Sequence, residues 1–200
     1  MRAGHRRADP LTGTTRERLI EAAADVIAEA GYDRAGVQEI ARRAGLTNGA
    51  IYANFRDKSE LLAEAVEVGL VRLIGRMDDA RRAGASPAQV IELIGRTLAL
   101  ATPARHRRLV SEALAAARRD PDVGERVRQL LSTLESHVSS VVAEALHDGD
   151  IAGDVDPSTL ARFGVALAIG YHVTYSAGMP EPDPEAWTRL MTRVLASLRA

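Results

Sequence analysis

The sequence predicts an all-α protein of about nine helices, with an N-terminal three-helix unit followed by a larger helical region. Apolar residues recur at helical spacing in many segments, and no segment keeps the alternation typical of a strand. Prolines fall at the boundaries of these segments, where one helix ends or the next begins. The expected helices span residues 15–30, 37–44, 48–54, 58–83, 87–101, 103–119, 121–148, 157–177 and 184–199.

Capping patterns mark the beginnings of these helices. Thr14 with Glu17, and Asp57 with Glu60, have the spacing of a capping box. Five later helices open with a capping residue followed by Pro, which suits the first helical position because its missing N–H would have no partner there. These pairs are Ser86-Pro87, Thr102-Pro103, Asp120-Pro121, Asp156-Pro157 and Asp183-Pro184.

Composition limits the classes of protein that fit. The 200 residues are 46% hydrophobic and 26% charged, which is ordinary for a soluble globular protein. Cysteine is absent, which excludes disulfides and thiolate metal sites, and no His pair has metal-ligand spacing, so no metal or cofactor is expected. The uncharged segment 163–180 is expected to be a buried helix, since a membrane span needs ~20 predominantly apolar residues. Without an apolar leader near the N-terminus, the expected location is the cytoplasm, with no membrane partner.

The segment VQEIARRAGLTNGAIYANF, residues 37–55, has the pattern of a helix-turn-helix. Gly45 is expected to end the first helix in a left-handed conformation, which Gly adopts freely. Thr47 is a natural N-cap for the second helix, which Ile51 would anchor to the core. Small Ala41 lets two helices cross closely, and the apolar stripe of residues 15–30 completes a three-helix core. The alternative is an ordinary tight corner between two core helices.

Residues 16–66 resemble the N-terminal region of the TetR family of regulators. The shared pattern consists of Ile40-Ala41, Ala44-Gly45, Gly49 with Tyr52 and Phe55, and Lys58 with Leu61. The resemblance implies a ligand-responsive regulator of transcription, a repressor that binds a palindromic operator as a homodimer and is released by a small effector. It implies a helix-turn-helix domain at 15–57 and a ligand-binding and dimerisation domain at 58–200. Residues 1–14 contain Gly4, Pro10 and Gly13 and lack helical periodicity, so they are expected to be a flexible arm. The later region resembles the family only in the number and length of its helices.

The resemblance assigns DNA contacts to particular residues. Thr47, Asn48, Gly49 and Ala50 would lead the second helix into the major groove of double-stranded operator DNA. Tyr52 and Lys58 would contact phosphates, with Arg42 and Asn54 as further candidates. The chain departs from the family at Asn48, where Lys is common, at Asn54, where His is common, and at Ala35 and Gly36, where Thr or Ser is common.

Two hypotheses follow from these departures. Asn48 would read adenine through its amide, and Arg42, Arg43 and the arm residues Arg2, Arg6 and Arg7 would restore phosphate or minor-groove contacts. A solvated surface charge is the alternative for each arginine. Because the net charge is −1, DNA binding requires the basic groups to gather on one small face.

A helix-turn-helix of this kind normally works as a dimer on a palindrome, so a self-complementary surface is expected. The helix at 184–199 has a clean apolar stripe, and the helix at 157–177 is apolar nearly all round and must be covered on several sides. A four-helix bundle from two subunits is expected, and packing within the monomer alone is the alternative. The expected interface residues are Ala161, Gly164, Ala168, Trp187, Leu190, Met191 and Val194.

Effector contacts are expected from residues with an apolar body and a polar tip on otherwise apolar faces. These are His106, His137, Tyr171, His172 and Tyr175. Few charges fall on these faces, so a mostly apolar or aromatic small molecule is expected. The alternative for each histidine is a core residue whose hydrogen bonds are made within the protein. A ligand that favours one tilt of the helix at 58–83 would change the separation of the two recognition helices, which tight binding needs at about one DNA turn, ~34 Å.

Other classes of function remain open. An all-helical enzyme would need a nucleophile, a metal or paired acids, and no such cluster is evident, so catalysis is not expected. Asp148, Asp150, Asp154 and Asp156 lack the order of a cation-binding loop. A helical adaptor that kept the fold without binding DNA would be compatible with the uncharged Asn48 and Asn54. Repression and activation cannot be distinguished by the sequence.

Overall fold

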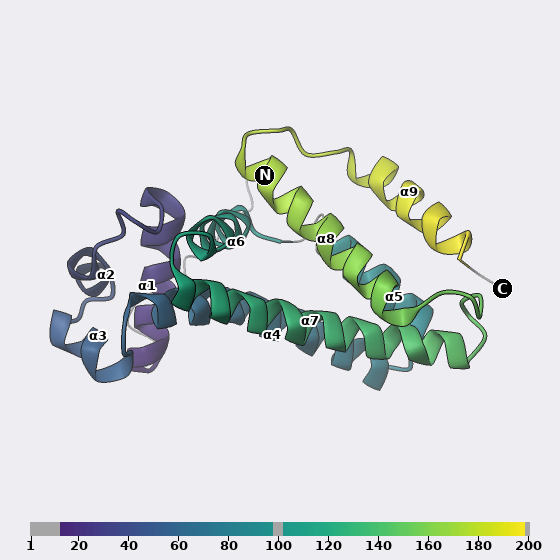
Figure 1. Cartoon of the computed structure of the whole chain (residues 1–200), viewed down its shortest axis with the longest axis horizontal. Coiled ribbons are helices and arrows are strands. Elements are labelled where there is room, and N and C mark those ends of the chain that lie inside the picture. The colour runs from purple at the N-terminus through teal and green to yellow at the C-terminus, as the bar shows by residue number, and fades with distance from the viewer. Residues whose placement is uncertain (1–12, 98–101, 199–200) are drawn as a thin grey trace, which may run out of the picture.

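The computed structural model describes residues 13–97 and 102–198, and within these ranges every regular element is a helix. Helices α1–α3 gather at one end of an elongated molecule, while α4 and α7 run side by side along its length, with α8 and α9 on the opposite side from α4 (Figure 1). The helices are α1 (Thr15–Ala30), α2 (Val37–Arg43), α3 (Asn48–Asn54), α4 (Lys58–Arg82), α5 (Pro87–Arg96), α6 (Ala104–Ala117), α7 (Pro121–His147), α8 (Pro157–Ser176) and α9 (Pro184–Ala196). The predicted all-α fold is confirmed.

Most of the predicted caps form as expected. Thr14 and Ser86 each make a complete capping box, and the Asp120, Asp156 and Asp183 carboxylates each accept a backbone N–H from the first turn of their helices. Local hydrogen bonding within a few residues therefore fixes where these helices begin.

Two predicted caps differ from expectation. Asp57 Oδ1 accepts the Glu60 N–H at 2.7 Å, but the Glu60 carboxylate accepts the Arg56 N–H at 2.6 Å, so the box at α4 is only half formed. Pro103 takes the N-cap position of α6, and the hydroxyl of Thr102 donates to the carbonyl of Thr97 instead. Helix α5 ends at Arg96, with Thr97 as its C-cap, and residues 98–101 of the helix expected at 87–101 lie outside the described residues, as do Arg2, Arg6 and Arg7 of the expected arm.

Two clusters of buried apolar side chains hold the helices together. The first joins α1–α3 to the first half of α4, to α6 and to the start of α7, and includes Leu19, Ile51 and Leu109. The second joins the rest of α4 to α5, the rest of α7 and the start of α8, and includes Met77 and Val141. The first cluster crosses the division predicted between residues 57 and 58, so the helix-turn-helix packs directly on the larger region.

The turn between α2 and α3 has the predicted geometry. Gly45 has a φ of +65°, where a side chain would be strained. The Leu46 N–H donates to the Ala41 carbonyl at 2.9 Å, which closes the end of α2. Leu46 is half-buried against the first cluster, so the turn is fixed by both its backbone and its packing.

Candidate DNA-binding surface and effector site

Helix α3 turns one side inward and the other to solvent. Ile51 and Phe55 are buried in the first cluster. Asn48 and Gly49 are exposed, and the side chain of Tyr52 is 64% exposed, which is unusual for so large an aromatic residue. The leading edge of the helix is thus free of the rest of the described chain.

Two arginines from α1 fix the position of the helix-turn-helix. Arg16 donates to the Asn54 carbonyl at 2.6 Å, pairs with Glu64 of α4, and lies 4.5 Å from the centre of the Phe55 ring. Arg18 donates to the Ala44 carbonyl at 2.7 Å, at the end of α2. Sequence reasoning missed both residues, because their partners lie at least 26 positions away along the chain.

The polar side chains at α3 differ in whether they form hydrogen bonds within the helix. Thr47 is the N-cap residue, but its side chain makes no capping hydrogen bond. The Asn54 amide donates to the Ala50 carbonyl at 2.8 Å, so one of its groups is engaged within the helix. Ala50 is half-buried, whereas Thr47 is exposed beside Asn48.

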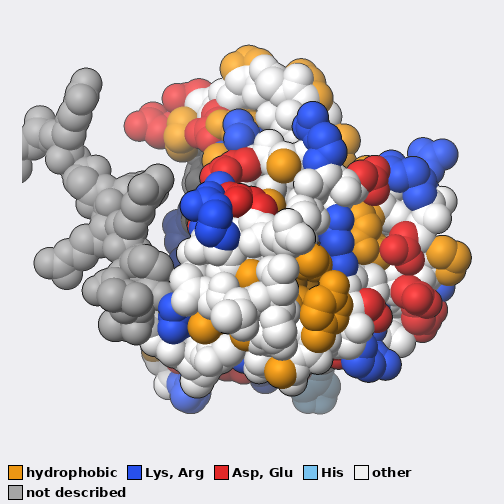
Figure 2. All heavy atoms as spheres, turned by 90° about the vertical axis from the view of Figure 1, so that its left-hand side faces the viewer, with side chains coloured by type: hydrophobic (Ala, Val, Ile, Leu, Met, Phe, Trp, Pro, Cys, Tyr) orange, Lys and Arg blue, Asp and Glu red, His pale blue; other side chains and the backbone are white. Residues whose placement is uncertain are grey.

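Acidic side chains neutralise the basic groups near α3. Arg42 forms two hydrogen bonds, of 2.7 and 2.8 Å, with the Glu39 carboxylate, and these hold the pKa of Glu39 below its usual value. Arg43 pairs with Glu29 at 2.7 Å. Figure 2, which views the molecule from this end, shows Lys and Arg side chains interspersed with Asp and Glu. On this face, Arg42 and Arg43 thus have their charges paired with acidic side chains.

Lys58 lies at the joint between the helix-turn-helix and the rest of the molecule. Its ammonium group lies 4.4 Å from the centre of the Tyr32 ring, and burial lowers its pKa. The Tyr32 N–H donates to Glu112 of α6 at 2.9 Å, and its hydroxyl donates to Asp120 at 3.4 Å. Burial, followed by the charge of Asp120, raises the pKa of Tyr32 to about 12. Because Tyr32 bonds to both Glu112 and Asp120, a movement of the α6–α7 corner would pull on the segment that directly follows α1.

Four of the five predicted effector residues lie on α6 and α8. The Tyr171 and Tyr175 rings are 5.8 Å apart, and His172 is buried. Burial, and then the neighbouring charges of His172, Arg105 and Arg72, lower the pKa of His106 to about 4, so its ring is neutral near pH 7. The fifth residue, His137, is exposed on α7, with its ring Nδ1 3.2 Å from the Thr133 carbonyl.

A buried arginine lies among these aromatic residues, which corrects the expectation that few charges fall there. Arg107 is only 5% exposed, and its guanidinium carbon lies 3.9 Å from the centre of the Tyr175 ring. It donates to the Thr102 carbonyl at 2.7 Å and to the Glu181 carboxylate at 3.0 Å. Sequence reasoning missed this residue because Arg105, Arg107 and Arg108 form one basic run, within which only packing distinguishes the buried member.

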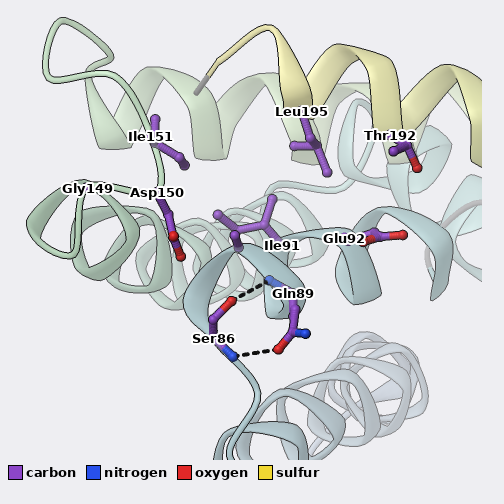
Figure 3. Close-up of a pocket in the computed structure, with 10 residues that line it drawn as sticks. Ser86, Gln89, Ile91, Glu92, Gly149, Asp150, Ile151, Thr192 and Leu195 are labelled. Atoms are coloured by element: carbon purple, nitrogen blue, oxygen red, sulfur yellow. Dashed lines mark hydrogen bonds between the residues drawn. The ribbon is translucent and has the colours of Figure 1, made fainter. Parts of the chain in front are cut away.

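A separate cleft of about 420 Å³ lies at the far end of the molecule, between α5, the α7–α8 loop and α9 (Figure 3). Ile91 and Leu195 face each other across it, and Glu92 and Asp150 add acidic groups to its wall. None of the predicted effector residues lines this cleft. Among the described residues, no cluster of His, Asp and Glu could hold a metal ion.

The predicted dimer-interface residues divide into two groups. Ala161 and Ala168 are buried within the chain, because that side of α8 packs on α6 and α7. Gly164, Trp187, Met191 and Val194 are half-buried, and Leu190 is 52% exposed. The outward side of α8 instead presents Phe163 and Leu167, while no residue of α9 is buried. In the part of the chain that the structure describes, no helix has the length and apolar character of a membrane span.

Comparison with known proteins supplies two family matches that together cover most of the chain. The model described as bacterial regulatory proteins, tetR family, matches residues 19–65. The model described as BetI-type transcriptional repressor, C-terminal, matches residues 87–200.

One relative by sequence and two solved structures are similar to this chain over most of their length. The Fatty acid metabolism regulator protein of Bacillus subtilis (strain 168) is 23% identical over 138 residues, or 69% of this chain and 71% of that protein. The fatty acid degradation regulator FadR from Bacillus halodurans superposes with a TM-score of 0.79 at 18% identity, covering 92% of this chain and 95% of that one. FadR from Bacillus subtilis, in complex with stearoyl-CoA, superposes with a TM-score of 0.70 at 20% identity, covering 91% and 98%. At such identities the structural likeness concerns the fold.

Proposed function

Because the chain belongs to the TetR family of bacterial transcription regulators, we propose that it binds a palindromic operator as a homodimer and represses transcription until a small apolar or aromatic effector releases it. The protein is a ligand-responsive, DNA-binding regulator with a helix-turn-helix at its N-terminal end. Its role is one of binding, not catalysis, and it acts in the cytoplasm, where its operator lies.

The outward edge of α3 is the observation that carries DNA binding. Asn48, Gly49 and Tyr52 are exposed together, while Ile51 and Phe55 anchor the opposite side of the same helix. Asn48 offers an amide that can pair with adenine in the major groove, and Gly49 lets the backbone approach the bases. Thr47 and Tyr52 offer hydroxyls to phosphates, to which Arg42 and Lys58 would add charge after leaving Glu39 and Asp33.

Exposed apolar side chains on α8 and α9 support a homodimer. Phe163, Leu167 and Leu190 are exposed, and α9 packs mainly on α5, which leaves its apolar stripe largely uncovered. An uncovered apolar surface of this kind favours association with a second copy, in which α8 and α9 of both subunits would form a four-helix bundle.

Helix α4 is the proposed route from effector to DNA. It contributes Leu61 and Leu62 to the first buried cluster and Leu73 and Met77 to the second. An effector that prefers one arrangement of the second region would therefore shift α4 and the helix-turn-helix together. The relative in complex with stearoyl-CoA supports an effector with a large apolar part.

Fluorescence anisotropy with the DNA upstream of the chain's own gene tests the proposal. Asn48→Ala should weaken binding about fivefold or more, because one bidentate base contact is worth ~1–3 kcal/mol. Asn54→Ala is the matched control, since that amide already bonds within α3, and it should change affinity less. If the parent protein binds this DNA no better than a scrambled duplex, or if both variants bind as the parent does, the assignment of α3 is wrong.

A further inference from the structure

The burial of Arg107 requires an explanation beyond packing. A charged group is rarely buried unless its hydrogen-bonding groups are satisfied. Arg107 is 5% exposed, but its Nε–H has no acceptor among residues 13–97 and 102–198. Nη1 donates to the Thr102 carbonyl, and Nη2 donates to Glu181 through one oxygen at 3.0 Å.

Glu181 is an incomplete and accessible partner for this arginine. It lies in the connection between α8 and α9, and its side chain is 51% exposed, against 6% for that of Arg107. Nε and Nη2 form one edge of a guanidinium, and that edge can bind both oxygens of a carboxylate at once. Glu181 uses only half of the edge, so the stronger bidentate arrangement is left unmade.

The side chains around Arg107 supply further donors and an aromatic surface. The Tyr171 hydroxyl and the Trp187 Nε1 are buried, and neither has a hydrogen-bond partner among the described residues. Their rings are 5.5 Å apart, and the Tyr171 ring is 5.8 Å from that of Tyr175. With Arg107 Nε, the groups left without partners are two N–H groups and one hydroxyl. This set suits a ligand that brings acceptors.

We propose that Arg107 is the effector-recognition residue of this protein, and that it binds the carboxylate of a small molecule whose apolar or aromatic part lies against Tyr171, Tyr175 and Trp187. Glu181 occupies the arginine in the unliganded protein and is displaced by the effector carboxylate. The inference rests on the proposed function for the regulatory consequence, but the binding itself does not depend on DNA.

A carboxylate fits this site better than a cation or a neutral molecule. A cation would have to compete with Arg107 itself, which already lies over the Tyr175 ring. A neutral molecule would not replace the charge of Glu181, so its binding would leave a buried guanidinium without a counterion. Displacement of Glu181 would also free the α8–α9 connection, which connects binding to the surface proposed for the dimer.

Trp187, the only tryptophan of the chain, provides a direct readout of binding. We would titrate the DNA-free protein with phenylacetate and octanoate, and with phenylacetamide and octanamide as neutral counterparts, and follow the Trp187 fluorescence. At least one carboxylate should bind tenfold or more tightly than its amide. Arg107→Met should abolish this preference, whereas Arg108→Met, at the exposed neighbouring arginine, should keep it. Equal binding of acid and amide, or an unchanged preference in Arg107→Met, would overturn the proposal.

A second variant tests the site even if Arg107→Met fails to fold. Glu181→Gln leaves the buried arginine without its anion, so acetate should raise the melting temperature of this variant more than that of the parent, relative to chloride at equal ionic strength. It should also bind the carboxylate probes several-fold more tightly. The absence of both effects would overturn the inference. Neither measurement contains DNA, so a failure of operator binding would count only against the proposed function.

Discussion

Substitution of Gly69 by alanine tests whether α6 packs tightly on the middle of α4. A Cβ atom at Gly69 would overlap the imidazole of His106, approaching within 2.8 Å of Nδ1 and closer to Cε1 and Nε2. A Cβ atom at Gly75, six residues further along the same helix, would meet no atom within 4 Å among the described residues. The two glycines therefore differ in packing while sharing the same helix.

The opposing contributions can be estimated. Alanine in the interior of a helix is favoured over glycine by roughly 0.5–1 kcal/mol, so Gly75→Ala should raise the free energy of unfolding by that amount. Gly69→Ala gains the same helix term but also forces extra volume between α4 and α6, which costs about 1–3 kcal/mol. Because the helix term cancels, the difference between the two variants is this packing cost.

Thermal and chemical denaturation at one fixed protein concentration would measure the difference. For a chain of this length, each kcal/mol shifts the melting temperature by ~2–4 °C, so Gly69→Ala should melt several degrees below Gly75→Ala. Truncation of His106 to alanine should be less harmful in the Gly69→Ala background than in the parent, because it removes the overlap. If Gly69→Ala stabilises the protein as much as Gly75→Ala, the packing of the His106 ring against Gly69 of α4 is wrong.

Three further outcomes are expected. The folded-state pKa of His106 is about 4 against an ordinary 6.5, so the unfolded chain binds a proton between these values that the folded chain does not. The free energy of unfolding should fall as the pH drops from 6.5 to 4, by about 3 kcal/mol at most, at ~1.4 kcal/mol per pH unit. Urea denaturation at several pH values should show that this fall is smaller in His106→Gln than in the parent. Glu39→Gln releases Arg42 from its paired carboxylate. In anisotropy titrations, DNA affinity should therefore rise, and its dependence on salt should steepen by about one counterion. The control Asp79→Asn, which releases Arg82 at the far end of α4, should change neither quantity. Gly45→Ala forces a side chain onto a residue with a φ of +65°. It should therefore lower the free energy of unfolding by roughly 1–2 kcal/mol relative to Gly36→Ala, where φ is −79° and an added Cβ would meet no atom within 4 Å. An equal effect of both substitutions would contradict the left-handed turn.

The sequence by itself determined the helices and the turn between α2 and α3. The caps at Thr14, Ser86 and Asp156 bond to backbone within three residues, and Gly45 sets its own backbone conformation. The apolar pattern then predicts that Ile51 anchors the second helix to the core, where the structure places it. Each of these inferences depends on interactions between residues that are close in the chain, so the residue types at fixed spacings are enough to predict them.

Only the tertiary structure decided which helix faces meet and what lies between them. Helix α8 is apolar all round, so its periodicity could not tell that Ala161 and Ala168 pack inward while Phe163 faces out. Arg107 becomes a buried residue because α6 and α8 close around it, and its partner Glu181 is 74 positions away. Arg16 likewise bonds to the Asn54 carbonyl of α3 only because α1 packs beside α3 in the fold. Such pairings are set by long-range packing of whole helices, and no local pattern distinguishes these arginines from others that remain in solvent.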